Sequence, residues 1–224
     1  MYQVPYLFLF LYVAIEYATD PFVAFKDADV VFFLASLPLK GDRASLLSSN
    51  ISIYMNFGKA LEAGAHKNCK SIVVANPANT LTYVLMKTAP SIARDGFIAL
   101  NRTDFNRARM IALRICREKC NYFLYTHFII DDPSLELHDL HDIFVWGNHS
   151  DSMFADVSHA MIRDKPLLEC IPDLSVWDDA FVKEVQKRGW VLMQLRDNVS
   201  SSLSVARASV DVARDIFLGT NVWN

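Results

Sequence analysis

This sequence of 224 residues contains few glycines and few cysteines, and its positive and negative charges nearly balance. Its seven glycines are widely separated, so the chain has no glycine-rich loop of the G-x-G-x-x-G type that cradles phosphate groups. A formal net charge of −3 leaves no basic excess, which argues against nucleic acid as a partner. Among the four cysteines only Cys116 and Cys120 lie close in sequence, and no second pair completes a zinc site. We therefore expect free thiols and no bound metal.

Long apolar runs are missing as well. The apolar run at residues 6–15 is shorter than the roughly 18 residues that a membrane-spanning helix needs. It has no basic segment before it and no convincing cleavage site after it, so we expect a buried strand or helix, with a signal peptide as the alternative. A content of 52% hydrophobic and 21% charged residues is typical of a globular protein.

Apolar strand patterns alternate with helical patterns along the chain, and turn residues separate them. Such alternation predicts an α/β fold with a Rossmann-like parallel sheet. Chemistry in these sheets gathers where strands end, and four polar residues follow predicted strands: Ser36, Asn76, Asp104 and His149. The predicted strands are 29–35, 71–75, 98–100 and 143–146, and the predicted helices are 46–65, 81–89, 104–119, 181–188 and 202–217.

His149 is the strongest candidate for acid–base chemistry. It comes directly after a predicted strand and Gly147, where its imidazole can project into a cleft. A carboxylate on one ring nitrogen would fix the tautomer and stabilise the protonated ring, and Asp104 can supply it. The alternative for Asp104 is a capping role, since Thr103 or Asp104 would cap the helix that follows.

Two arginines are candidates for binding an anionic substrate. Arg107 lies three residues after Asp104, so the two side chains share one face of a helix. A guanidinium there can hold a carboxylate through two parallel hydrogen bonds. Arg43 stands in a polar loop after the first predicted strand and could close over a substrate. The alternatives are a surface ion pair for Arg107 and plain solvation for Arg43.

Three segments, residues 76–80, 102–108 and 146–150, occur in an order that resembles three signatures of the cytosolic-type malate dehydrogenases, within the lactate/malate dehydrogenase superfamily. The resemblance extends over about residues 18–220. Several motifs in register are a much stronger signal than one short match. The resemblance implies a partial dinucleotide-binding domain in residues 1–100 and a partial substrate domain in residues 101–224.

The resemblance also implies roles for the candidate residues. His149 matches the proton acceptor, and Asp104 matches the carboxylate paired with it. Arg107 matches the arginine that binds the substrate's C1 carboxylate, and Arg43 matches the loop arginine that polarises the reacting carbonyl. Asn76 matches an asparagine that contacts both substrate and nicotinamide.

Contacts to NAD are implied for a further set of residues, namely Asn50, Val74, Ala75 and again Asn76. NAD would supply the redox chemistry, and the residues around it would orient the substrate. The resemblance further implies a homodimer in the cytoplasm that acts on a small dicarboxylate, malate or oxaloacetate.

The sequence departs from the family in several places. The phosphate loop and the acidic residue that binds the adenosine ribose are both missing, as though the chain began after them and residues 1–17 were unrelated. Leu39 and Lys40 stand where the family carries two arginines, which puts the preference for dicarboxylates in doubt. Residues 121–137 read as an apolar insertion, and the chain stops before the family's final strands and helix.

Two hypotheses follow. The first is an NAD-dependent malate dehydrogenase that transfers hydride with a His149–Asp104 proton relay. The second is a catalytically inactive, partial relative that acts as an interaction or structural module. A membrane-anchored protein is a third reading, which the shortness of the apolar run argues against.

Overall fold

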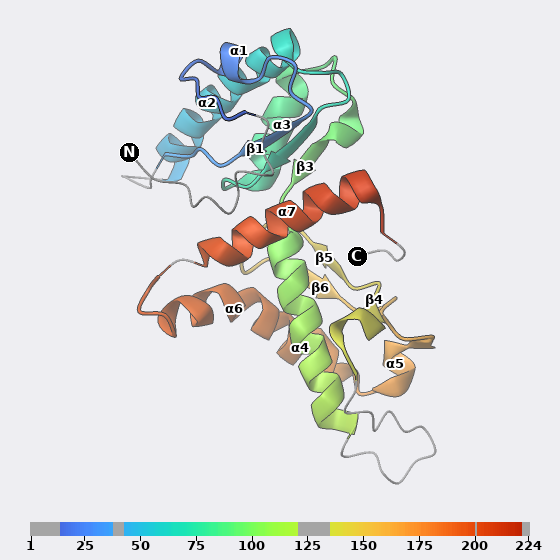
Figure 1. Ribbon diagram of the computed structural model, residues 1–224. Helices are drawn as coiled ribbons and strands as arrows, with labels where there is room; N and C mark the ends of the chain where they lie inside the picture. The colour runs from blue at the N-terminus through green and yellow to red at the C-terminus, as the bar shows by residue number, and fades with distance from the viewer. Residues whose placement is uncertain (1–13, 38–42, 121–134, 200, 221–224) are drawn as a thin grey trace. The chain divides into compact units, whose positions relative to one another are not determined.

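The computed structural model describes residues 14–37, 43–120, 135–199 and 201–220 (Figure 1). Contacts between Cα atoms divide the chain into two compact units. The first unit comprises the described parts of Met1–Val31, Leu37–Ser71 and Tyr83–Phe97, and the second comprises those of Phe32–Ser36, Ile72–Thr82 and Ile98–Asn224. The apolar run at 6–15 falls almost wholly outside the described residues, and so does most of the predicted insertion, at 121–134.

Helices and strands alternate through the first half of the described chain and mix more irregularly in the second. The helices are α1 (Pro21–Ala24), α2 (Arg43–Gly64), α3 (Ala78–Thr88), α4 (Arg102–Cys120), α5 (Leu167–Cys170), α6 (Val182–Gln194) and α7 (Ser202–Leu218), with short turns η2 (Arg94–Gly96) and η3 (Leu137–Asp139) and a π-helical turn η4 (Val176–Phe181). The strands are β1 (Val30–Phe33), β2 (Lys70–Val73), β3 (Phe97–Ala99), β4 (Leu140–His141), β5 (Phe144–Trp146), β6 (Phe154–Asp156), β7 (Met161–Ile162) and β8 (Lys165–Pro166).

The expected parallel sheet is present as a three-stranded sheet in the order β1-β2-β3. The strand β2 occupies its centre, and Ser71, Ile72 and Val73 are fully buried there. The edge strand β1 buries Val31 and Phe33 but leaves Phe32 39% exposed. An apolar run of this kind is typical of a strand buried on both faces, which holds for β2 but not for the edge strand β1.

The expected strand at 143–146 forms, but not in this sheet. It is β5, and it pairs antiparallel with β6, with Val145 opposite Ala155. The short strands β4, β7 and β8 form a further antiparallel sheet. Sequence patterning missed these strands because two residues carry too few positions to show an alternation.

The core of the second unit forms around α4. Phe105, Ala108, Ala112 and Cys116 recur at helical spacing and are buried on one face of this helix. The β5–β6 hairpin and helices α6 and α7 contact α4. The helix that begins beside the candidate site is therefore also the element on which the rest of the unit packs.

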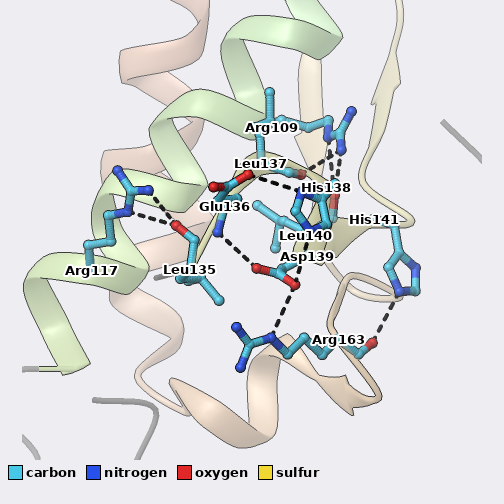
Figure 2. A network of polar contacts seen from close by, with 10 residues as sticks. All are labelled: Arg109, Arg117, Leu135, Glu136, Leu137, His138, Asp139, Leu140, His141 and Arg163. Atoms are coloured by element: carbon cyan, nitrogen blue, oxygen red, sulfur yellow. Dashed lines mark hydrogen bonds and ion pairs between the residues drawn. The ribbon is translucent and has the colours of Figure 1, made fainter. Parts of the chain in front are cut away.

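Two arginines of α4 bind the chain segment that leads into β4 and β5 (Figure 2). Arg109 donates to the carbonyl oxygens of Leu137 and Leu140 at 2.6 and 2.9 Å, and Arg117 donates to the carbonyl oxygen of Leu135. Burial lowers the pKa of the Arg109 guanidinium, and the charge of Arg102 lowers it further. These bonds satisfy backbone carbonyl oxygens, and they fix the approach to β5 against α4.

The predicted helices are present with shifted ends. The pattern at 181–188 continues in α6 to Gln194, and a π-helical turn precedes it. The last predicted helix, α7, ends at Leu218, where Gly219 adopts a φ of +74° as a C-terminal cap. No helix in the described part of the chain combines the length and the apolar character needed to cross a membrane.

Candidate active site

Asp104 is the centre of the candidate site. Its carboxylate is 1% exposed, and each oxygen has one charged or chargeable partner. Oδ2 lies 2.5 Å from Nδ1 of His149, and Oδ1 accepts a hydrogen bond from Arg107 at 2.9 Å. One buried carboxylate thus joins the two residues that sequence analysis singled out as acid–base group and anion-binding group.

The capping alternative for Asp104 is wrong. Helix α4 begins at Arg102, so Thr103 and Asp104 lie in its first turn rather than at the cap position. Both carboxylate oxygens of Asp104 are bound to side chains instead. A negative charge in the first turn still interacts favourably with the helix dipole.

His149 reaches Asp104 from the loop that follows β5. The chain turns at Gly147, whose φ of +89° lies in the left-handed region that favours glycine. The His149 side chain is 47% exposed, so its Nε2 edge is accessible while Nδ1 contacts the buried carboxylate. The hydrogen bond that His149 donates to Asp104 raises the pKa of His149 above 6.5. Partial burial and the Arg107 charge oppose the shift, and the Asp104 charge adds to it.

His149 lines a small cavity of about 200 Å³ together with four asparagines. Asn76 is exposed in this cavity and follows β2, as the sequence predicted. A volume of this size is below the roughly 300 Å³ at which pockets for drug-sized ligands begin. The cavity suits a small polar group, such as a carboxamide head group or a short 2-oxo acid. The other asparagines lining it are Asn79, Asn101 and Asn148.

Arg107 lines a second, larger cavity of about 810 Å³ between α4, α6 and α7. Its guanidinium lies against the backbone of α6, because Gly189 leaves room for it. A Cβ atom at position 189 would stand 3.1 Å from an Arg107 terminal nitrogen. Ser204, at the start of α7, lines the same cavity. Arg107 and His149 therefore line different cavities, although both bind the Asp104 carboxylate.

Of the predicted cofactor contacts, Val74 and Ala75 belong to the second unit and Asn50 to the first. Val74 and Ala75 directly follow β2, and their amides donate to the Phe33 carbonyl. Asn50 is buried in the other unit, where its side-chain oxygen accepts a hydrogen bond from the Leu37 amide at 2.9 Å. Arg43 is the first residue of α2, and its side chain is outside the described part of the chain, as are Leu39 and Lys40.

Sequence analysis missed three residues of this site. Asn79 and Asn101 bind the loop that carries His149, and Gly189 makes room for Arg107. Asn79 stands inside a motif that was singled out, but its partner Gly147 is 68 residues further along the chain. A contact over that separation leaves no local pattern.

Replacing Gly147 by alanine tests the importance of the turn before His149. We expect Gly147→Ala to destabilise the chain by roughly 1–2 kcal/mol, because a Cβ atom strains the left-handed backbone. Urea denaturation measures the change. Alanine at Gly219, which also has a positive φ but no neighbour within 4 Å of an added Cβ, separates backbone strain from crowding. An unchanged midpoint for Gly147→Ala would contradict the expected strain.

Comparisons with known proteins match both parts of the chain to one family. Residues 7–97 match the NAD binding domain of lactate/malate dehydrogenases, and residues 134–224 match the alpha/beta C-terminal domain of the same proteins. The first match begins inside the segment that we expected to be unrelated. The human cytoplasmic malate dehydrogenase is 36% identical over 205 residues, which is 88% of this chain and 56% of that protein.

Solved structures give the same result. A malate dehydrogenase from Naegleria fowleri superimposes with a TM-score of 0.75 and 26% identity, covering 88% of this chain and 55% of that one. A Trichomonas vaginalis lactate dehydrogenase in complex with NADH and oxamate gives a TM-score of 0.71 and 32% identity, covering 88% and 56%.

The fold and the matched domains define an α/β protein of the NAD-binding dehydrogenase class. More closely, the chain belongs to the lactate/malate dehydrogenase family. It spans about half the length of the relatives that it matches.

Proposed function

We propose that this chain carries the acid–base and carboxylate-binding half of an NAD-dependent 2-hydroxy acid dehydrogenase, with malate and oxaloacetate as its substrate pair. The single observation that carries the proposal is the buried Asp104 carboxylate, which binds His149 through one oxygen and Arg107 through the other. Because the chain belongs to the lactate/malate dehydrogenase family, we assign this arrangement to the oxidation and reduction of 2-hydroxy and 2-oxo acids.

The imidazole of His149 moves the proton. Asp104 accepts the Nδ1 hydrogen bond, which leaves Nε2 on the accessible edge of the ring to take the hydroxyl proton of the substrate. The Asp104 carboxylate stabilises the imidazolium that results, and it fixes the tautomer before the reaction. In the reverse direction the same imidazolium returns its proton to the carbonyl oxygen.

Arg107 orients the substrate. One terminal nitrogen donates to Asp104, and the other donors of the planar guanidinium remain to hold a carboxylate in two parallel hydrogen bonds. A substrate held in this way keeps its reacting carbon close to His149, because Asp104 fixes both side chains. By the family pattern, Arg43 adds positive charge at the reacting oxygen.

The residues present fit the nicotinamide end of NAD. Asn76 offers an exposed carboxamide in the same small cavity as His149, and Val74 and Ala75 form the backbone beside it. NAD, when bound, supplies the acceptor and donor of the hydride. We include Asn50 as a further contact by the family pattern alone.

Malate and oxaloacetate are the favoured pair because the human cytoplasmic malate dehydrogenase is similar over 88% of this chain. Lactate and pyruvate are the second candidate, which the similarity to the Trichomonas vaginalis lactate dehydrogenase favours. The third possibility is an inactive relative that serves as an interaction module.

We also propose a division into a dinucleotide-binding part at 1–100 and a substrate part at 101–224.

Dimer formation and a cytoplasmic location belong to the same proposal. Large apolar side chains on and beside α6 and α7 are exposed, and such groups commonly mark a surface that another chain covers. Light scattering of the purified chain measures its mass, and a monomer at all concentrations would contradict the dimer. The exposed side chains are Trp190, Leu195, Leu203, Val210 and Leu218.

The decisive experiment offers NADH and two substrates in parallel. We expect NADH fluorescence to change saturably on binding, and NADH to be oxidised faster with oxaloacetate than with pyruvate. Preference for pyruvate would replace malate by lactate in the proposal. If NADH fluorescence does not change at millimolar cofactor, the catalytic proposal fails for this chain, and the interaction module becomes the better reading.

The pH dependence of the reaction follows from the His149–Asp104 bond. Because the pKa of His149 is raised above 6.5, we expect oxaloacetate reduction, which needs the imidazolium, to persist above that pH and to fall only through the raised pKa. Malate oxidation needs the neutral ring and should rise through the same pKa. Initial rates in both directions across pH measure it, and Asp104→Asn should move both transitions to lower pH.

The same shift affects stability. A histidine whose pKa is raised by folding stabilises the folded chain fully below its unfolded pKa, near 6.5. That contribution is lost as the pH rises through the raised pKa. Urea midpoints measured across this window should therefore fall with pH in the parent chain and change less in His149→Asn; parallel curves would contradict the linkage.

Alanine at Gly189 tests the placement of Arg107. The change should favour α6 intrinsically by about 1 kcal/mol, since glycine is a poor helix former. The new Cβ would nevertheless crowd the Arg107 guanidinium at 3.1 Å. We therefore expect a higher KM for oxaloacetate with no loss of thermal stability. A variant whose KM is unchanged would show that Arg107 does not need this room.

A further inference from the structure

Two asparagine side chains bind the loop that carries His149. Asn79, near the start of α3, donates through Nδ2 to the Asn148 side-chain oxygen at 2.7 Å and to the Gly147 carbonyl at 3.4 Å. Asn101, directly before α4, donates through Nδ2 to the Val145 carbonyl at 2.7 Å. The two amides thus bind the loop on either side of the point where it leaves β5.

Residues 147–149 of this loop are held by little side-chain packing. Gly147, Asn148 and His149 are all exposed, so side-chain burial contributes little to their position. Gly147 also has a backbone conformation that most residues avoid, and Asn148 and His149, which follow it, lie outside the helices and strands. A loop of this kind adopts one conformation only where polar contacts over-determine it.

The position of the loop decides whether His149 meets Asp104. Asp104 is buried in the first turn of α4 and cannot follow a displaced imidazole. A hydrogen bond of 2.5 Å tolerates little displacement, because such bonds weaken steeply with distance and angle. Since Asn101 directly precedes α4, its bond to Val145 connects the base of the loop to the helix that carries the carboxylate.

We propose that Asn79 and Asn101 are positioning residues that hold the loop 145–149 so that the imidazole of His149 stays bonded to Asp104. The contribution of the bond to proton transfer rests on the proposed function; the positioning itself does not. Neither asparagine needs to contact the reacting atoms. Each acts through the loop backbone or through Asn148.

Replacing Asn79 and replacing Asn101 would remove hydrogen bonds to different parts of the loop. Asn79→Ala frees the Asn148 side chain and the Gly147 carbonyl, at the tip of the loop. Asn101→Ala frees the Val145 carbonyl within β5, whose pairing to Ala155 remains. We therefore expect Asn79→Ala to loosen His149 more than Asn101→Ala, and the double variant to loosen it most.

Titration of the His149 ring by NMR in the full chain, without cofactor or substrate, tests the proposal. The resonance is assigned by its loss in His149→Asn. We expect the protonation constant of His149 to fall about threefold in Asn79→Ala and by less in Asn101→Ala, as the Asp104 bond is populated less. The charged groups that act on this ring, Asp104 and Arg107, are unchanged in both variants.

Asn106→Ala is the matched control. Asn106 is also an asparagine of α4, but it lines the larger cavity, away from the loop. It should leave the His149 titration unchanged. A purely structural role for Asn79 and Asn101 would lower the melting temperature without moving the titration of the folded chain. Superimposable His149 titrations in the parent, in Asn101→Ala and in Asn79→Ala would overturn the proposal.

The outcome of this titration does not depend on whether the proposed function is correct. A chain that binds no NADH but shows the shifted titrations keeps the positioning proposal and loses the catalytic one. An active chain whose titrations do not shift loses the positioning proposal alone. If Asn79→Ala does not fold, Asn101→Ala decides, because the β5–β6 pairing still supports its backbone.

Discussion

Replacing His149 by asparagine is expected to lower oxaloacetate-dependent NADH oxidation by about 10²- to 10⁴-fold, the usual contribution of a positioned acid–base group. Asparagine keeps a polar side chain of similar reach but cannot carry a proton at neutral pH. Asp104 would then retain Arg107 as its charged partner, so the buried carboxylate stays compensated. Initial rates of NADH consumption at saturating oxaloacetate measure the effect.

His138→Asn is the matched control. The side chain of His138 is 76% exposed and contacts only the acidic groups of its own short turn. Its removal should leave the rate within a factor of about two, as expected for a surface change. Equal losses in both variants, or a full rate in His149→Asn, would reject His149 as the proton carrier.

The largest expected loss of stability comes from Trp177→Ala. Trp177 is 1% exposed, packs edge-to-face on Phe181 with ring centroids 5.4 Å apart, and donates through its indole nitrogen to the Ile171 carbonyl at 3.1 Å. Removing the ring leaves a cavity and an unpaired buried carbonyl. We expect a loss of about 3–5 kcal/mol in the free energy of unfolding.

Tyr17→Ala provides the control for this change. Tyr17 is 96% exposed, and its removal should alter the free energy of unfolding by no more than about 0.5 kcal/mol. Urea denaturation at one protein concentration compares both variants with the parent chain. Similar midpoints for the two variants would show that the core around α4 does not depend on Trp177.

The sequence predicted the local part of the fold well. The helical periodicity at 104–119 became α4, and the apolar run at 71–75 became the central strand β2. These elements can be recognised in the sequence because each run has enough residues to show its pattern. The hairpin of β5 with β6 was not foreseen, since its pairing depends on a partner eight or more residues away and on a bend in between.

The contacts of the candidate site could likewise be predicted from the sequence only where the partners are close along the chain. Asp104 and Arg107 could be paired from sequence because they are three residues apart on one helix. The hydrogen bond between His149 and Asp104 crosses 45 residues; side-chain chemistry made Asp104 a candidate partner, and the family resemblance implied the pairing. The contacts of Asn79 and Asn101 to the loop had no such guide.

By itself, then, the sequence determined the helices, the buried central strand and the identity of the residues that can carry a proton or bind a carboxylate. These properties follow from side-chain chemistry and from periods that a short window contains. Only the tertiary structure decided that one buried carboxylate serves both His149 and Arg107, and that two distant asparagines bind the His149 loop. Such contacts depend on how separate elements pack, and no local pattern in the chain encodes that packing.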